Sequence, residues 1–465
     1  MENFWDYSVW GMFNVVGVLL MSLLVANMLK RKVKFLQASL IPTSVLGGGI
    51  LVVVAGIYKA ITGDIMFDTA FFDGKGTATL EVLTYHCLAL GFIAASFKTS
   101  EGKLSKQRTV EIFNTGVTTV ATYLLQAVVG FGITLVVAMW IIKDFFPAAG
   151  VLLPFGYGQG SGQAMNYGMI YESQFGFEGG KSFGLTIAAL GFISASVGGV
   201  IHLNILRKKG KIRNTATEEG AISSGDIQAQ GEIPMQESMD KLTVQIALIA
   251  LAYMIAYLLM YLLGNFVLPG MKSVIFGFNF LLGVLTATLV KSVMKFLKKK
   301  NIIHREYTND FLMTRASNFF YDLMVVAGVA AIRLSALENY WGVILVVGVV
   351  GLVITYVYNL VIAKVLFPEY PQEQFLMMYG MLTGTASTGV ILLREIDGDF
   401  KTPAADNLVY QNFPAIVFGF PLMLLATLAP QKPWLTFIIL LAFFLVMNII
   451  LFRSLIFRRR NKKEQ

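Results

Sequence analysis

The sequence predicts an all-α polytopic membrane protein made of two inverted repeats, each with five transmembrane helices and one re-entrant hairpin, plus one extra C-terminal helix. The 465 residues are 56% hydrophobic and 14% charged, against roughly 25% charged in soluble domains. Apolar runs of spanning length recur along the chain, and basic residues cluster between alternate runs. Cys87 is the only cysteine, which excludes a disulfide scaffold and a cysteine-based zinc site.

Eleven apolar runs have the length of about 20 residues that a helix needs to cross a ~30 Å hydrocarbon core. Two further stretches, about 147–172 and 372–396, are apolar but interrupted near their centres by Gly, Ser and Thr, so each limb reaches only about halfway across. We therefore predict a re-entrant hairpin in each. The eleven predicted spans are about 8–29, 37–58, 80–97, 110–142, 182–206, 242–268, 274–296, 318–337, 341–366, 405–429 and 434–455.

The basic residues predict the orientation, because Lys and Arg near span ends favour the cytoplasm. Five clusters hold 25 of them, whereas the alternate connections hold 6. We expect a multi-pass protein of the cell membrane with its N-terminus outside and its C-terminus in the cytoplasm. The net charge of +9 is explained by these clusters, and no nucleic-acid partner is expected. The clusters lie at 30–34, 98–108, 207–213, 291–305 and 453–463.

The predicted domains follow from this topology. Residues 1–206 form the first repeat, whose hairpin opens outward, and residues 242–429 form the second, whose hairpin opens inward. Because each repeat has an odd number of spans, the second is inverted relative to the first. The polar residues 207–241 are expected to be a flexible cytoplasmic linker. Residues 430–465 add the extra helix and a basic tail.

The hairpin tips are the candidate binding sites, since non-helical backbone at membrane depth must be buried in protein or line a wet cavity. A helix leaving a tip presents N–H groups that suit a carboxylate, and an arriving helix presents carbonyls that suit Na⁺. We predict a small anionic substrate, with Na⁺ near Ser161 and Thr385; the alternative is that the small residues only permit close helix packing. The candidate residues are Gly158, Gln159, Gly160, Ser161, Gly162, Gln163 and Asn166 in the first tip and Thr383, Gly384, Thr385, Ser387 and Thr388 in the second.

Charged residues in the eighth span are a second candidate feature, because ionisable groups inside membranes are commonly functional. Asp322 and Arg333 are eleven residues apart, which would place them on nearly the same helix face, ~16 Å apart along the axis. Both are candidate substrate or ion contacts. An interfacial carboxylate and a snorkelling arginine are the alternatives.

With these motifs placed, the chain resembles the bacterial glutamate:sodium symporter family over residues 35–425. The similar segments are FLQASLIPTSVLGGGILVVVAG (35–56), LGFIAASF (90–97), GQGSGQAM (158–165) and GLTIAALGFISASVGGVI (184–201). The resemblance implies an inverted-repeat fold and a homodimer with a scaffold and a mobile transport part. It implies Na⁺-driven symport of glutamate or a related amino-acid dicarboxylate by elevator-like alternating access, with no cofactor other than the coupling ion and no enzyme activity.

Three other functions are compatible with parts of the pattern. Re-entrant loops also form the selectivity filters of ion channels. A carboxylate carrier could be driven by H⁺ instead of Na⁺. An intramembrane serine hydrolase would use Ser161 as nucleophile with His202 or His86 as base.

Overall fold

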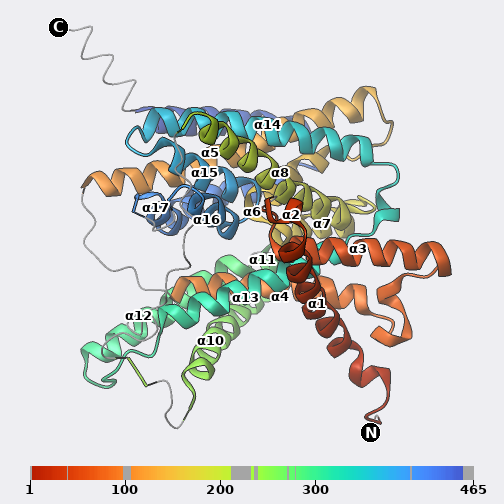
Figure 1. The fold of residues 1–465 in the computed structure, drawn as a ribbon, viewed down its shortest axis with the longest axis horizontal. Helices are drawn as coiled ribbons and strands as arrows, with labels where there is room; N and C mark the ends of the chain where they lie inside the picture. Colours follow the sequence, from red (N-terminus) through yellow and green to blue (C-terminus); the bar gives the residue numbers. More distant parts are fainter. Residues whose placement is uncertain are drawn as a thin grey trace. The chain divides into compact units, whose positions relative to one another are not determined.

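The computed structural model describes residues 3–38, 40–97, 106–210, 232–234, 239–269, 272–277, 279–397 and 401–453. Within these ranges the chain is helical, apart from loops and an isolated β-bridge between Glu232 and Glu306. The predicted all-α fold class is confirmed (Figure 1). Most of the predicted linker, and the basic tail beyond Arg453, lie outside the described residues.

In the described part of the chain, nine helices are long and apolar enough to cross a membrane, and each coincides with a predicted span. A multi-pass membrane protein is therefore confirmed. The nine contain α1 (Tyr7–Lys32), α3 (Thr43–Thr62), α4 (Gly76–Phe97), α5 (Lys106–Trp140), α8 (Gly180–Lys208), α10 (Lys241–Leu262), α12 (Asn279–Lys299), α14 (Trp341–Leu366) and α19 (Pro433–Leu451).

The other two predicted spans differ from the helices observed. Helix α13 (Asp310–Ala330) begins well before residue 318 and ends well before residue 337. In the 405–429 region the chain forms α17 (Ala404–Tyr410) and α18 (Asn412–Leu428), which separate at Gln411. The apolar part of α18 is Pro414–Leu428, shorter than a full span.

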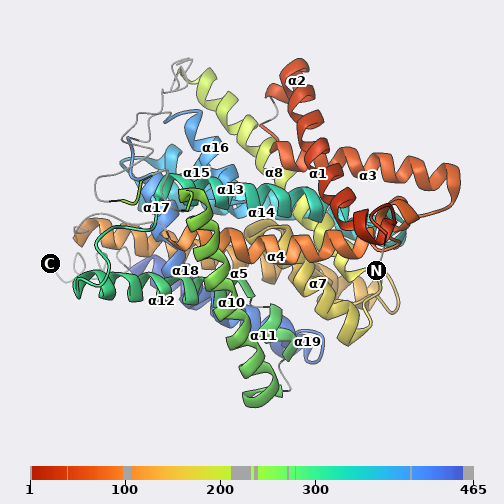
Figure 2. The same ribbon diagram turned by 90° about the horizontal axis from the view of Figure 1, so that it is seen from below.

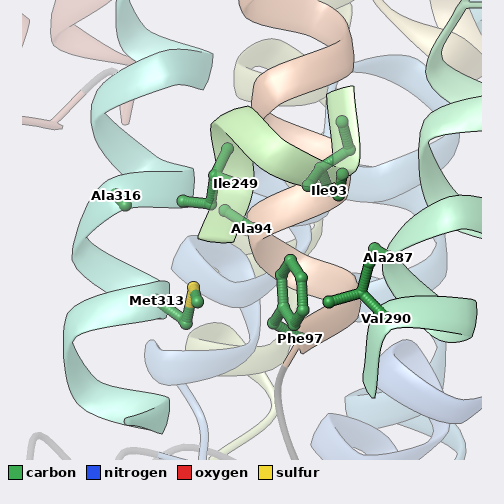
Figure 3. Close-up of a cluster of buried hydrophobic side chains, with 9 residues drawn as sticks. Ile93, Ala94, Phe97, Ile249, Ala287, Val290, Met313 and Ala316 are labelled. Atoms are coloured by element: carbon green, nitrogen blue, oxygen red, sulfur yellow. The ribbon is translucent and has the colours of Figure 1, made fainter. Parts of the chain in front are cut away.

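The chain divides into two compact units, and unit 1 comprises Met1–Met21, Ile61–Lys103 and Thr215–Gly328. Its centre is a group of four helices, α4, α10, α12 and α13, that pack together (Figures 1 and 2). Their facing side chains are apolar, and several of them are alanines, which allow the helices to approach closely. Figure 3 shows this core, formed by Ile93, Ala94, Phe97, Ile249, Ala252, Ala287, Val290, Met313 and Ala316.

The end of the predicted linker is part of unit 1. Glu232 accepts hydrogen bonds from Lys241 Nζ at 2.7 Å and from Asn309 Nδ2 at 2.8 Å. Lys241 is fully buried at the start of α10. A buried ammonium requires such a partner, so Glu232 is fixed to the helices of this unit.

Unit 2 comprises Ser22–Ala60, Leu104–Asn214 and Val329–Gln465. Helix α5 is central in it and contacts α14, α17, α18 and α19. Both interrupted segments also belong to this unit, and they pack against α8. Each unit draws residues from both predicted repeats, so the inverted-repeat boundaries stay a prediction.

Candidate functional site

The first interrupted segment is a pair of helices joined by one residue. Helix α6 (Leu152–Gln159) ends at Gly160, and α7 (Ser161–Phe175) begins immediately after it. Gly160 has φ +88° and ψ 179°, a conformation that is open essentially only to glycine. The two arms fold back on each other, with the rings of Phe155 and Tyr167 stacked at 3.9 Å between centroids. The single-residue break places the predicted tip residues beyond Gly160 inside the first turns of α7.

The polar residues at the start of α7 are fully enclosed. Ser161, Gln163 and Asn166 are each exposed by 1% or less, while Gln159 is partly exposed. Within the described part of the chain, Ser161 Oγ and both amide atoms of Gln163 have no hydrogen-bond partner. Buried polar atoms are normally paired, so these atoms are suited to contact a bound molecule or ion.

The second interrupted segment comprises α15 (Pro371–Thr383) and α16 (Ala386–Arg394), joined by Gly384 and Thr385. The two arms lie side by side in Figures 1 and 2. A Cβ atom on Gly380 would lie 2.8 Å from the Cα atom of Gly389, so their backbones touch.

The hydroxyls of the second tip are hydrogen-bonded within the hairpin. Thr383 Oγ1 donates to Tyr379 O at 2.6 Å. The hydroxyls of Thr385 and Thr388 are 3.4 Å apart. Ser387 is in α16, and its side chain lies outside the described residues.

Helix α8 brings the ends of α6 and α15 together. A Cβ atom on Gly191 would lie 2.4 Å from Thr383 O and 3.1 Å from the ring of Tyr157. The Tyr157 hydroxyl is 2.8 Å from Ser194 Oγ and donates to Gly348 O at 2.6 Å. The carboxyl-terminal ends of the first arms of both hairpins therefore meet at one point on α8.

Helix α5 holds the same two ends through side chains that sequence reasoning missed. The Tyr123 hydroxyl donates to Gly158 O at 3.0 Å. Gln126 Nε2 donates to Leu382 O and to Thr355 Oγ1, each at 2.9 Å. Gln126 is fully buried, and its Oε1 has no partner in the described chain. A glutamine in the middle of an apolar run was the signal that could have revealed it.

The predicted pairing of Asp322 and Arg333 on one helix face is wrong. Helix α13 ends at Ala330, and Arg333 lies beyond it in extended backbone. Its N–H donates to Ser182 Oγ at 3.2 Å, and its side chain is exposed. Asp322 is in the middle of α13 in unit 1, outside the cluster that the hairpins form within unit 2.

Charged residues after the second hairpin have structural partners. Glu395 pairs with Arg207 at 3.2 Å. Asp397 accepts from Thr402 Oγ1 and from the N–H groups of Thr402 and Lys401, at 2.5–2.9 Å. Burial alone would raise the pKa of the Asp397 carboxyl, but these hydrogen bonds outweigh it and the net shift is downward.

The geometry does not assemble the hydrolase considered above. His202 is hydrogen-bonded through Nδ1 to the Tyr356 hydroxyl and through Nε2 to Gln372 Oε1. His86 Nδ1 contacts the Tyr253 hydroxyl at 2.7 Å. Within the described residues, Ser161 Oγ has no hydrogen-bond partner, so His202, which belongs to the same unit, is not positioned as its base.

Comparison with known proteins identifies one family. The family model described as sodium/glutamate symporter matches residues 11–373. The matched region includes the first hairpin and ends just inside α15, before the second tip. A search of curated proteins gave no match.

Proposed function

The chain belongs to the sodium/glutamate symporter family, and from this premise we propose that it takes up glutamate or a related dicarboxylate by Na⁺ symport at the two hairpin tips of unit 2. The family is one of membrane transporters. The observation that supports the site most strongly is the enclosed, unpartnered group of Ser161 Oγ and the Gln163 amide beside the Gly160 break.

The start of α7 is suited to a carboxylate. The N–H of Ala164 donates to the carbonyl oxygen of Gly160, and this is the first i to i−4 hydrogen bond of α7. The preceding N–H groups, from Ser161 to Gln163, have no partner in the first turn, and the helix dipole adds partial positive charge there. The Gln163 amide can donate to the same anion, whereas the Ser161 hydroxyl can donate to it or accept from an ammonium group.

Sodium is expected where helices arrive at the tips. Gly158 O and Leu382 O each accept one hydrogen bond, but a carbonyl oxygen has two lone pairs and can accept a second contact. The unpartnered Gln126 Oε1 adds a neutral oxygen next to Leu382. Hard cations favour oxygen ligands of this kind. Sodium here is a transported ion, and no resident cofactor is required.

We propose that unit 2 is the mobile part and unit 1 the scaffold of an elevator-like alternating-access cycle, with the protein acting as a homodimer. Unit 2 contains both hairpins and the helices that hold them, α5, α8 and α14, so it could move without disturbing the site. The N-terminus is proposed to be outside and the C-terminus inside the cell, as the basic clusters favour.

Uptake by the purified protein in liposomes tests the function. An inward Na⁺ gradient should drive accumulation of labelled glutamate, and replacing Na⁺ by choline should abolish it. Accumulation sustained by a pH gradient alone would instead identify an H⁺-coupled carrier. Labelled glutamate should also exchange against internal unlabelled glutamate, since a carrier shows such counterflow and a channel does not.

A further inference from the structure

One face of α5 is polar over half of the helix, although the face is buried. The polar positions are spaced four, four, three and four residues apart, which places them in one row along the helix. Each threonine and the glutamine in the row is exposed by 1% or less. From the first to the last position the row rises ~22 Å. It consists of Glu111, Thr115, Thr119, Thr122 and Gln126.

Amide side chains from other segments of unit 2 face this row. Gln374 of α15 donates to Thr115 Oγ1 at 3.2 Å, and Gln411 Oε1 lies 2.9 Å from Thr119 Oγ1. Asn359 Oδ1 of α14 lies 3.5 Å from Thr122 Oγ1. The row is therefore continuous from Gln126, which donates to Leu382 O beside the second tip, to Glu111 near the N-terminal end of α5.

The threonine hydroxyls in the row present mainly lone pairs. Thr115, Thr119 and Thr122 each lie within 3.1 Å of the carbonyl oxygen four residues earlier, to which the hydroxyl can donate. A hydroxyl has one proton and two lone pairs, so a threonine oxygen that donates its proton to the helix can still contact a donor or a cation. The side-chain atoms facing Thr119 and Thr122 are also oxygens, so acceptor oxygens are concentrated around these two residues.

Both ends of the row have a fully buried amide oxygen without a partner in the described chain, Gln126 Oε1 and Asn407 Oδ1. Asn407 Nδ2 donates to Gln374 Oε1 and to the Tyr370 hydroxyl, which donates to Glu111 at 2.8 Å. Arg108 forms an ion pair with Glu111. Neutral oxygens of this density suit a desolvated monovalent cation and disfavour an anion.

The C-terminal half of α5 has no such row of oxygens among its described contacts. There, Gly130 packs directly against the backbone of Gly150, and the Thr134 hydroxyl is bonded to Pro147 O and Gly150 N. The row of acceptor oxygens therefore extends from the tips in one direction only, toward Glu111.

We propose that this row, Glu111 to Gln126 of α5 with its facing amides, is the path along which the coupled Na⁺ passes between the hairpin tips and the N-terminal end of α5. The inference rests on the proposed Na⁺ symport, and the basic cluster at 98–108 assigns that end of α5 to the cytoplasm.

Isosteric removal of single hydroxyls tests the path. Thr119→Val and Thr122→Val remove acceptor oxygens from the row while keeping side-chain shape. Thr84→Val is the matched control, because Thr84 is a fully buried threonine in α4 of unit 1, outside the row, and its hydroxyl likewise donates to the carbonyl four residues earlier, Leu80 O at 2.8 Å. The measurements are ²²Na⁺ exchange and the Na⁺ dependence of glutamate uptake in liposomes, with the unfolding temperature as a check on folding.

We expect Thr119→Val and Thr122→Val to slow ²²Na⁺ exchange several-fold and to raise the Na⁺ concentration for half-maximal uptake, with Thr84→Val like the parent. Thr119→Ser, which keeps the hydroxyl, should restore exchange. If the two row variants exchange ²²Na⁺ like Thr84→Val, or if they lower only the unfolding temperature, the row is a packing device and the path is rejected. A parent protein whose uptake ignores Na⁺ would instead reject the symport itself, and the path with it.

Discussion

Unit 1 and unit 2 both bury amide side chains, but they satisfy them differently. In unit 1, Gln245 donates to Lys241 O and Tyr307 O, and its Oε1 accepts from Asn309 N. In unit 2, the Gln163 amide has no partner at either atom. The buried atoms Gln126 Oε1, Ser161 Oγ, Asn407 Oδ1 and Thr436 Oγ1, which likewise lack partners in the described chain, also belong to unit 2. Since an unmade buried hydrogen bond costs about 1–3 kcal/mol, this difference supports the binding role proposed for Ser161 and Gln163 in unit 2.

The largest loss of stability is expected when the buried ion pair of unit 1, between Lys241 and Glu232, is broken. Lys241→Met leaves Glu232 largely enclosed without its cation, and breaking such a pair costs about 3–5 kcal/mol. The unfolding temperature in detergent should fall strongly. Lys298→Met is the control, because its pair with Glu306 has the similar distance of 2.6 Å but both side chains are 40% or more exposed, and such pairs contribute under ~1 kcal/mol. Equal losses in the two variants would contradict a folding role for buried charge in unit 1.

A matched pair of glutamines tests the comparison directly. Gln245→Leu should lower the free energy of unfolding by about 1–3 kcal/mol, because it removes the buried hydrogen bonds to Asn309 N and Tyr307 O. Gln163→Leu should leave stability unchanged or slightly raised, since no hydrogen bond is lost, but should weaken glutamate binding by tenfold or more. Thermal unfolding and equilibrium binding at saturating Na⁺ distinguish the two. A Gln163 variant that is destabilised but binds normally would reverse the assignment.

The smallest effects are expected at the single hydroxyls of the tips. Ser161→Ala and Thr385→Ala should each weaken glutamate or Na⁺ binding several-fold, as expected for one lost contact of ~1 kcal/mol. Thr62→Ala, which removes an exposed hydroxyl that accepts from Asp64 N, should bind as the parent does. Cysteines placed at 161 and 385 should be protected from thiol reagents by saturating substrate. If both alanine variants bind normally and neither cysteine is protected, the tips do not form the site.

The sequence predicted most of the helices because hydropathy summed over about 20 residues averages out local irregularities. It misplaced the end of α13 because the chain leaves the helix at Ala330 to let Arg333 N bond to Ser182, a contact between residues far apart in sequence. The glycine-rich motif correctly indicated a broken helix near Gly160. It could not show that the break is one residue long, which leaves Gln163 on helix α7.

The residues that hold the tips were harder to predict. Tyr123 and Gln126 donate hydrogen bonds to the backbone carbonyl oxygens of Gly158 and Leu382. Every residue has such a carbonyl, so the side chains of Gly158 and Leu382 give no sign of these contacts. Similarly, Gly191 resembles any small residue of a closely packed helix until Thr383 is placed against it. Such roles depend on which backbone atoms meet in three dimensions, and spacing along one helix carries no information on them.

The anchoring of Glu232 to Lys241 has a consequence for the reach of the chain. Gly210 belongs to unit 2 and Glu232 to unit 1, and the 22 peptide steps between them can extend to about 75 Å, more than twice the ~30 Å hydrocarbon thickness. In the proposed elevator-like cycle, the linker would therefore be too long to limit how far unit 2 travels. The chain passes between the units at four other places. One falls between α4 and α5, and three fall inside α1, α3 and α13, where helical backbone has no slack. The length of the proposed stroke would thus depend on how far these three helices can tilt.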